Sequence, residues 1–425
     1  MDFLEFLDCC VTPYHSAAVL ADCLGKAGFV SVDFAAPSAL EPGRDYYAVR
    51  GGAVIAVRVP KRVTARSRFR IALAHTDFPT LKITPNPDGV AAGIRTLHPE
   101  IYGSPLFTSW LDRDLGYAGL LAFEQEGSVR TRVFRGNKLF RIPQLAVHLN
   151  RGVNQDGLKV NPQTDLNVLW TAVGGTERFA DALLKELPAG AKLLDFDVQM
   201  FDAQPAQRGG FDDEWIYSGR LDNLSSCHAV AESLMASASP ENDFAVAAFF
   251  NNEEVGSETR EGAAGSFLKS VLEDVVRLSC AASVPGTTPV ASLSSVLAES
   301  FALSIDMAHA CHPNFVQKHE PNHAPVMGEG VVLKINSQKR YASDVLSGAK
   351  FRLLCEKNCI PYQAFVSRND MPCGSTVGPA VSASLGIPTV DIGEPMFSMH
   401  SAREMTAASD HESMVRLVTA FYKET

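Results

Sequence analysis

The sequence predicts an α/β protein in which helices flank a central mixed sheet and a β-rich segment interrupts the α/β part. Two observations predict it. In the first and last parts of the chain, apolar runs of strand length alternate with helical patterns, as in α/β layer folds. From about residue 81 to about residue 204, short β-like pieces and turns replace this alternation. We therefore expect one discontinuous unit, residues 1–79 and 206–425, and an inserted β-rich unit, residues 80–205.

The part before the insert contains one expected helix and two stretches of strand. A helix is expected over residues 12–29, because Thr12 is a capping residue and Pro13 suits the first helical turn. Strands are expected within residues 45–59 and over residues 69–77. The second stretch is almost continuously apolar, which is typical of a strand buried on both faces of a sheet. We therefore expect it near the centre of the sheet.

The part after the insert alternates helix and strand to near its end. Inside the insert, residues 178–187 have a helical pattern. After the insert, helices are expected over residues 224–237, 263–279, 343–358 and 374–385, and strands over residues 244–250, 301–308, 331–335, 362–366 and 388–392.

The composition is that of an ordinary globular protein without a nucleic-acid partner. The 425 residues are 46% hydrophobic and 20% charged, and the net charge of −10 disfavours binding to a polyanion. No apolar run approaches the roughly 20 residues that span a bilayer, and the acidic amino terminus does not resemble a signal peptide. The nine cysteines are scattered, and the spacing of Cys355 and Cys359 fits neither a zinc ribbon nor a redox motif. We therefore expect reduced thiols in a cytoplasmic protein without a membrane partner.

Potential metal ligands follow several of the expected strands. Taken singly, each acidic residue would more often be an ordinary surface residue. Open α/β sheets bind ligands at the carboxyl ends of their strands, so residues that recur at this position are expected to meet. The residues at or after strand ends are His75, Asp77, Glu253, Glu254, Asp306 and His400, and Asp222 stands just before an expected helix.

This set of donors predicts a site for zinc, or for manganese or cobalt. Imidazole nitrogen and carboxylate oxygen suit these ions better than they suit copper or an iron–sulfur cluster. Two histidines and three acids can hold two ions if one carboxylate bridges them, as in aminopeptidases, nucleases and phosphatases. The pair Glu253 and Glu254 then has two tasks: one glutamate binds metal, and its neighbour takes a proton from the attacking water.

One competing metal-binding motif is rejected, and the roles of two histidines are undecided. Residues 319–323, "HEPNH", match the H-E-x-x-H zinc pattern, which works only on a helix. Pro321 lies inside the motif, so a helix is not expected there. His309 and His312 are either ligands or packed loop residues.

A series of short motifs follows in order along nearly the whole chain. The motifs are "HTD", "TSWLDRDL", "RIPQLAVHLNR", "GRLDNLSSC", "FFNNEEVGSE", "DMAHACHPN", "KHEPNH", "INSQKRYAS", "RNDMPCGSTVGP" and "MHSAREM". Together they resemble the aspartyl aminopeptidase family of dinuclear zinc peptidases. The resemblance implies that His75, Asp222 and Asp306 hold one zinc ion, and that Asp222, Glu254 and His400 hold the other, with Asp222 bridging.

The same resemblance implies roles for five further residues. Glu253 would be the general base, and Asp77 would orient His75. His309, Lys334 and Tyr341 would contact the substrate.

The resemblance also implies an assembly and contains one departure. The insert would be a dimerisation domain, and the chain would form a homo-oligomer, a tetrahedral dodecamer. Some family members carry a histidine that reaches a neighbouring subunit's substrate where this chain has Asp165. An acid there would repel an acidic substrate, so the strictness of the preference for acidic residues stays open.

We therefore expect a cytoplasmic, two-zinc metalloaminopeptidase that releases the residue at the free amino terminus of peptides, with a preference for Asp or Glu. Alternatives are a broad-specificity aminopeptidase and an N-acyl amino acid deacylase on a related fold. A third alternative is a catalytically silent scaffold, which is disfavoured because every expected ligand is present.

Overall fold

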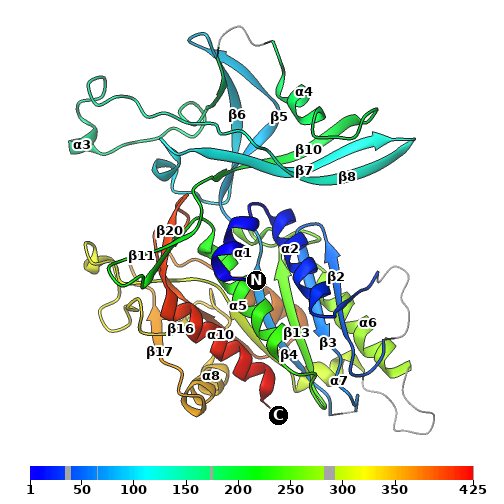
Figure 1. Ribbon diagram of the computed structural model, residues 1–425. Helices are drawn as coiled ribbons and strands as arrows, with labels where there is room; N and C mark the ends of the chain where they lie inside the picture. The colour runs from blue at the N-terminus through cyan, green and yellow to red at the C-terminus, as the bar shows by residue number, and fades with distance from the viewer. Residues whose placement is uncertain (34–39, 65, 173–175, 282–291, 425) are drawn as a thin grey trace.

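The computed structural model describes residues 1–33, 40–64, 66–172, 176–281 and 292–424. Figure 1 shows an α/β part that contains both termini, and a β-rich part that lies above one edge of it. The chain enters the β-rich part along β5 (Thr80–Ala91) and leaves it along β10 (Lys192–Asp202). The expected combination of a central sheet and a β-rich insert is confirmed.

The central sheet of the α/β part is mixed, as expected. Its order is β1-β2-β3-β13-β4-β14-β18-β16-β17. β4 is parallel to β13 and to β14, whereas β3 is antiparallel to β13 and β16 is antiparallel to β18. The strands are β1 (Val30–Ser31), β2 (Asp45–Arg50), β3 (Ala53–Arg58), β4 (Phe69–His75), β13 (Phe244–Phe250), β14 (Phe301–Ile305), β16 (Val331–Ile335), β17 (Tyr362–Val366) and β18 (Thr389–Gly393).

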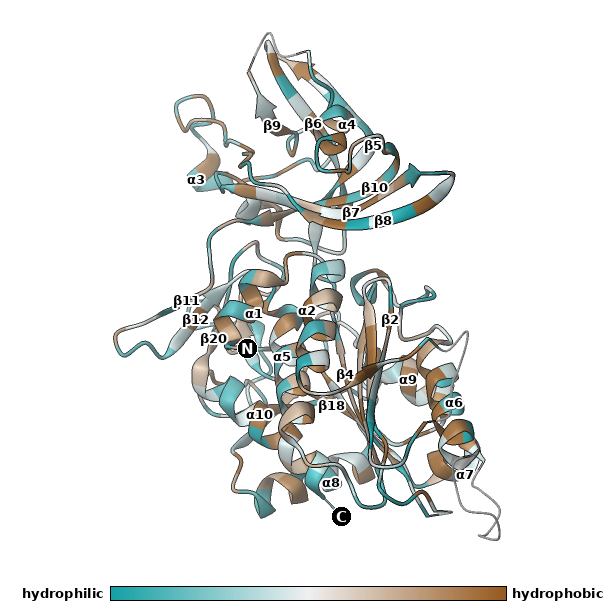
Figure 2. Ribbon diagram, turned by 45° about the vertical axis from the view of Figure 1, so that its right-hand side comes forward, coloured by the Kyte–Doolittle hydropathy of each residue, from teal (hydrophilic) through white to brown (hydrophobic). Residues whose placement is uncertain are grey.

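Helices cover both faces of this sheet because its inner strands are apolar on both faces (Figure 2). In β4, Ala72 and Ala74 belong to one core cluster, and Ile71 and Leu73 belong to the other. One face packs against α1 (Phe3–Cys9), α2 (Pro13–Lys26), α5 (Leu221–Ala236), α8 (Val345–Lys357) and α10 (Ala408–Lys423). The opposite face packs against α6 (Phe267–Ala281), α7 (Leu293–Ala298) and α9 (Val377–Leu385). Each fully buried leucine or phenylalanine in these layers stabilises the fold by roughly 1.5–3 kcal/mol.

The insert has a six-stranded antiparallel sheet with a core of its own. Its order is β8-β7-β10-β5-β6-β9. The remaining elements are β6 (Ile94–Tyr102), η1 (Phe107–Trp110), β7 (Leu115–Gln125), β8 (Ser128–Arg135), α3 (Val153–Asp156), β9 (Val168–Thr171) and α4 (Phe179–Leu184). Helix α4 lies within the helical pattern expected over residues 178–187.

A five-stranded sheet, which the sequence did not predict, lies beside the α/β part. Its order is β11-β12-β20-β19-β15. The strands are β11 (Gln207–Gly209), β12 (Trp215–Ser218), β15 (Ala308–His309), β19 (Pro395–Phe397) and β20 (Glu404–Ala407). These strands are too short to carry a recognisable alternation of apolar and polar residues. They matter here because β12 leads into α5 and β20 follows the loop that carries His400.

Two further observations bear on the sequence analysis. Within the described part of the chain, no helix combines the length and the apolar character that a membrane span requires. The cysteines whose side chains are described are all free.

Candidate metal centre

The carboxyl ends of three neighbouring strands bring several expected residues together. β13, β4 and β14 are adjacent and parallel, so their carboxyl ends lie at one edge of the sheet. β4 ends at His75, and β14 is followed by Asp306. After β13 and Asn251 comes Asn252, whose φ of 66° turns the chain into the 3-10 turn η2 (Glu253–Val255). The sheet edge therefore presents a histidine and three acids.

Asp222 and His400 reach this edge from other elements. Asp222 lies in the first turn of α5, where its backbone angles are not helical (φ −82°, ψ 105°). The neighbouring Asn223 side chain donates a hydrogen bond to the backbone oxygen of Ile305 at 2.8 Å. This bond holds the turn against the end of β14. His400 lies in the loop between β19 and β20.

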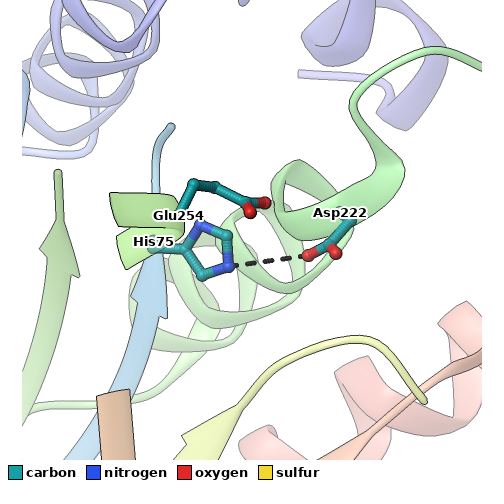
Figure 3. Close-up of side chains that lie close together, drawn as sticks. All are labelled: His75, Asp222 and Glu254. Atoms are coloured by element: carbon teal, nitrogen blue, oxygen red, sulfur yellow. Dashed lines mark ion pairs between the residues drawn. The ribbon is translucent and has the colours of Figure 1, made fainter. Parts of the chain in front are cut away.

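Asp222 occupies the centre of the group. Its Oδ1 lies 3.5 Å from His75 Nε2, and its Oδ2 lies 3.4 Å from His400 Nε2. His75 Nε2 is also 3.6 Å from Asp306 Oδ1, and His400 Nε2 is 3.4 Å from Glu254 Oε2. Figure 3 shows His75, Asp222 and Glu254 pointing toward one another, and these three offer ligand atoms within 4.8 Å of each other. The expected ligands are thus together in space.

Both histidines turn the same nitrogen toward Asp222. His75 Nδ1 donates to the backbone oxygen of Asp77 at 3.0 Å, and His400 Nδ1 donates to the backbone oxygen of Ser104 at 3.0 Å. A carbonyl oxygen only accepts hydrogen bonds, so Nδ1 carries a proton in both rings. Nε2 is then the atom available to a metal ion.

The electrostatics of the group demand positive charge. Burial opposes the protonated form of His75, but the nearby carboxylates of Asp222, Asp306 and Asp77 outweigh it and raise the pKa of His75 well above its usual range. Burial likewise opposes protonation of His400, but Asp222 and the charge of Glu254 raise the pKa of His400 to about 10. For Asp222, the two histidines overcome the effect of burial, so its pKa lies below the usual range. The carboxylates around the two imidazole rings therefore favour positive charge at this position.

Asp77 supports the glutamate pair more closely than it supports the imidazole of His75. Its carboxylate accepts hydrogen bonds from the backbone N–H groups of Glu253 and Glu254, both at 3.1 Å. The closest contact between the carboxylate and His75 Nδ1 is 3.5 Å, longer than the contact to the Asp77 backbone oxygen. Burial, and then the neighbouring acids, raise the pKa of Glu253 to about 8 despite the opposite effect of His75.

Three residues that were not predicted from the sequence support the centre. The Tyr102 hydroxyl donates to Asp77 Oδ2 at 2.8 Å, and Ser104 provides the backbone oxygen that binds His400. Both come from the insert, so only the folded chain brings them here. The third is Glu404, which accepts hydrogen bonds from the backbone N–H groups of Asp222 and His400. Its place in the motif "MHSAREM" is the one signal that singles it out in the sequence.

The expected substrate-binding residues lie next to the centre. His309 and Tyr341 line a pocket of about 230 Å³, together with Phe365 and Arg368. Lys334 is not among the described residues that line this pocket. Its side chain is 3% exposed, and its Nζ lies 3.6 Å from Asp306 Oδ2 and 5.4 Å from the centre of the Tyr341 ring.

The other residues that the sequence singled out make contacts within their own loops. His319 begins a non-helical segment, and His323 pairs with Glu320 at 2.6 Å, so the zinc-protease reading of this motif is excluded. The backbone N–H of His312 donates to His319 Nε2 at 3.0 Å, and His312 Nδ1 accepts a hydrogen bond from Asn314 N at 3.2 Å. Asp165 is exposed, and its carboxylate accepts hydrogen bonds from the Asn161 backbone and the Thr164 hydroxyl.

The residues fit a divalent metal. Asp222 Oδ1 is buried without a hydrogen-bond partner among the described residues, which is costly unless a cation satisfies it. Four carboxylates (Asp222, Glu253, Glu254 and Asp306) surround the histidines, and Lys334 is the one lysine or arginine of the described chain in ion-pair contact with them. Two nitrogen donors among several carboxylates suit zinc.

An α/β fold with a site of histidines and carboxylates at the sheet edge is characteristic of metal-dependent hydrolases. Residues 6–422 match the family described as Aminopeptidase I zinc metalloprotease (M18). The chain therefore belongs to the M18 family of zinc metalloaminopeptidases. It is 41% identical to a probable M18 family aminopeptidase 2 of Streptomyces avermitilis, over 99% of this chain and 96% of the relative. It is 39% identical to a protein of the same description from Pseudomonas aeruginosa, with the same coverage.

Solved structures agree with this assignment. The chain superposes on a chain of the cryo-EM complex of Ape4 and Nbr1 with a TM-score of 0.91 and 32% identity, over 99% of this chain and 84% of that chain. It superposes on the S. cerevisiae mApe1 dodecamer with a TM-score of 0.84 and 28% identity, over 99% of this chain and 95% of that chain.

Proposed function

We propose that this chain is a two-zinc aminopeptidase that removes the residue at the free amino terminus of peptides, with a preference for Asp or Glu. The position of Asp222 carries the proposal. Each of its oxygens faces a different histidine, and each histidine faces a second carboxylate. His75, Asp222 and Asp306 would hold one ion, and Asp222, Glu254 and His400 would hold the other.

Glu253 is the general base in this proposal. When bound, the ions supply Lewis acidity that polarises the scissile carbonyl and lowers the pKa of the attacking water. Glu253 accepts the proton of this water as it adds to the carbonyl carbon, and passes the proton to the amine nitrogen when the C–N bond breaks. The side chain of Glu253 is 14% exposed and that of Glu254 is 5% exposed, so Glu253 is the more open member of the pair. The Asp77 carboxylate accepts hydrogen bonds from the backbone N–H groups of both glutamates and so fixes the turn that carries them.

The preference for acidic residues is assigned to Lys334, with His309 and Tyr341. The Lys334 ammonium is buried, and its ion-pair contact is with Asp306. Because Asp306 would also serve as a metal ligand, it would balance the charge of Lys334 only in part. A substrate carboxylate beside Tyr341 would complete that balance.

Aminoacyl anilides test the proposal. The protein is assayed with Asp, Glu, Ala and Leu anilides in the presence of zinc, manganese or cobalt, and with N-acetyl-Asp anilide as the matched control. We expect hydrolysis that requires metal and a free α-amino group, with the highest kcat/KM for Asp or Glu, and two bound ions per subunit by elemental analysis. Preferential hydrolysis of the acetylated compound, or a stoichiometry of one ion, would contradict it.

We further propose that residues 80–205 form a dimerisation domain. The exposed apolar side chains of the segment after β8 support this role, since Leu145 is 62% exposed and Leu149 is 74% exposed. A relative, mApe1, is described as a dodecamer.

Deletion of residues 80–205 is expected to give smaller assemblies by light scattering. The deletion also removes Tyr102 and Ser104, so a milder double variant, Leu145→Asp with Leu149→Asp, separates assembly from activity. We expect this variant to have a lower assembly mass and to retain both ions. Val345→Asp is the matched control, because Val345 is an exposed apolar residue of the α/β part, outside residues 80–205. An unchanged assembly mass in both the deletion and the double variant would refute the assignment.

A further inference from the structure

Glu404 links Asp222 and His400, the two expected metal ligands that reach the centre from outside the strands of the central sheet. It is the first residue of β20 and is almost completely buried. Its Oε2 accepts a hydrogen bond from Asp222 N at 3.1 Å, and its Oε1 accepts one from His400 N at 2.7 Å. One carboxylate therefore spans the backbones of two residues that are far apart in the sequence.

The topology explains how one side chain reaches both. β20 pairs with β12 in antiparallel register, so Glu404 lies opposite Ser218, four residues before Asp222. His400 is four residues before Glu404 on the same chain segment. Asp222 has a non-helical backbone and His400 has a φ of 67°, so neither N–H is engaged by regular secondary structure. Glu404 satisfies both donors.

The Glu404 carboxylate has no lysine or arginine in ion-pair contact with it among the described residues. Other buried acids have such a partner, as Asp243 has Arg70. A buried carboxylate without a cationic partner is costly. Two backbone N–H groups offset part of that cost, and a cation in the adjacent site would offset more.

We propose that Glu404 is a positioning residue of the metal centre, which fixes Asp222 and His400 in the arrangement that lets both side chains bind the same ion. This inference rests on the two-ion centre proposed above. Glu404 touches no substrate in this role. Its loss should therefore weaken most the binding of the ion that Asp222 and His400 share, because both of their backbones bond Glu404. The chemistry should be intact once that ion is restored.

Glu404→Gln tests this with minimal change of shape. A glutamine keeps one carbonyl oxygen and replaces the other with an NH2 group, so either the Asp222 or the His400 N–H loses its acceptor. We expect calorimetric zinc titration of the metal-free protein to show one site weakened by about 10- to 100-fold, the usual cost of removing such a supporting group. With cobalt, the visible spectrum should change at that site. At saturating zinc, kcat should return toward the wild-type value, because the reacting groups are intact.

Glu394→Gln is the matched control. Glu394 is also a buried glutamate near the carboxyl end of the sheet, but it bonds Ser225 and His411 instead of ligand backbones. The Glu394→Gln variant should bind both ions as the wild type does. Wild-type affinity in Glu404→Gln, or equal weakening in Glu394→Gln, would overturn the role of Glu404. Fewer than two ions in the wild type would overturn the two-ion centre itself, so the two failures are distinguishable.

Hydrogen exchange on the unmodified protein provides a second test if the variant does not fold. Because Glu404 couples the two N–H groups to the metal centre, zinc binding should slow amide exchange in the peptides that contain Asp222 and His400. Exchange that is the same with and without zinc would contradict the proposal.

Discussion

Glu253→Gln is expected to retain both metal ions and to lower kcat by at least about 10²-fold, the usual scale for loss of a general base. A glutamine has nearly the shape of glutamate but cannot take a proton from the attacking water. The backbone N–H of residue 253 would still donate to Asp77, so the turn that carries the pair should keep its form. Steady-state kinetics with an aminoacyl anilide and elemental analysis of the purified variant measure the two quantities.

Glu254→Gln is the paired variant and should behave differently. The Glu254 carboxylate is nearly buried and lies 3.4 Å from His400 Nε2, so its replacement should release or weaken one ion. Part of its activity should return with excess zinc, whereas that of Glu253→Gln should not. Equal loss of metal in both variants, or the reverse pattern, would show that the two tasks are assigned wrongly.

Lys334→Ala is expected to lower kcat/KM for Asp and Glu substrates by about 10- to 150-fold. The kcat/KM for Ala and Leu substrates should change little. A lysine that meets a carboxylate in a partly dry pocket contributes about 1.5–3 kcal/mol. The structure supports a dry setting, since Lys334 is 3% exposed and packs against Tyr341. Parallel assays of the four aminoacyl anilides give the ratio directly.

The contact between Lys334 and Asp306 defines the competing outcome. If Lys334 serves only to hold Asp306, its loss will lower kcat/KM for acidic and neutral substrates by the same factor. It will also reduce the zinc content of the protein. Lys318→Ala is the control, because Lys318 lines the neighbouring pocket without an ion pair to Asp306 among the described contacts. A selective loss for acidic substrates in Lys318→Ala instead would move the specificity to that pocket.

The parts of the fold that follow from local sequence were predictable. The continuous apolar run of β4 indicated a central strand, and β4 lies between β13 and β14. Thr12 caps α2 as expected, and its side chain accepts a hydrogen bond from His15 N. Helix α10 was not predicted, although Met414, Leu417 and Phe421 lie on its buried face. It begins without a side-chain cap, so its amino end carries no local signal.

Some residues of the candidate site were likewise predictable from the local sequence, and others were not. His75, Asp306 and the glutamate pair were recognisable because each follows an apolar strand, and the parallel arrangement then places them together. His400 and Asp222 were also candidates, as a residue in the loop after the last expected strand and as a residue just before an expected helix. Their assignment to particular ions depended on the family resemblance. Tyr102 and Glu404 were not recognised, because their importance depends on hydrogen bonds to backbone N–H groups and to a buried acid from other elements. Such contacts leave no periodic pattern in the sequence.

Tyr102 and Ser104 also limit how far the two parts of the chain are interchangeable modules. The insert holds Asp77 through the Tyr102 hydroxyl and His400 through the Ser104 backbone oxygen, and Leu106 N donates to the backbone oxygen of His400 at 2.8 Å. The short strap from Tyr102 to Leu106 thus belongs by sequence to one module and by function to the other. A chimaera that grafts a relative's insert onto this sheet must supply an equivalent strap. A graft that lacks it would display every metal ligand and still lack the contacts that keep His400 and the supporting Asp77 in place.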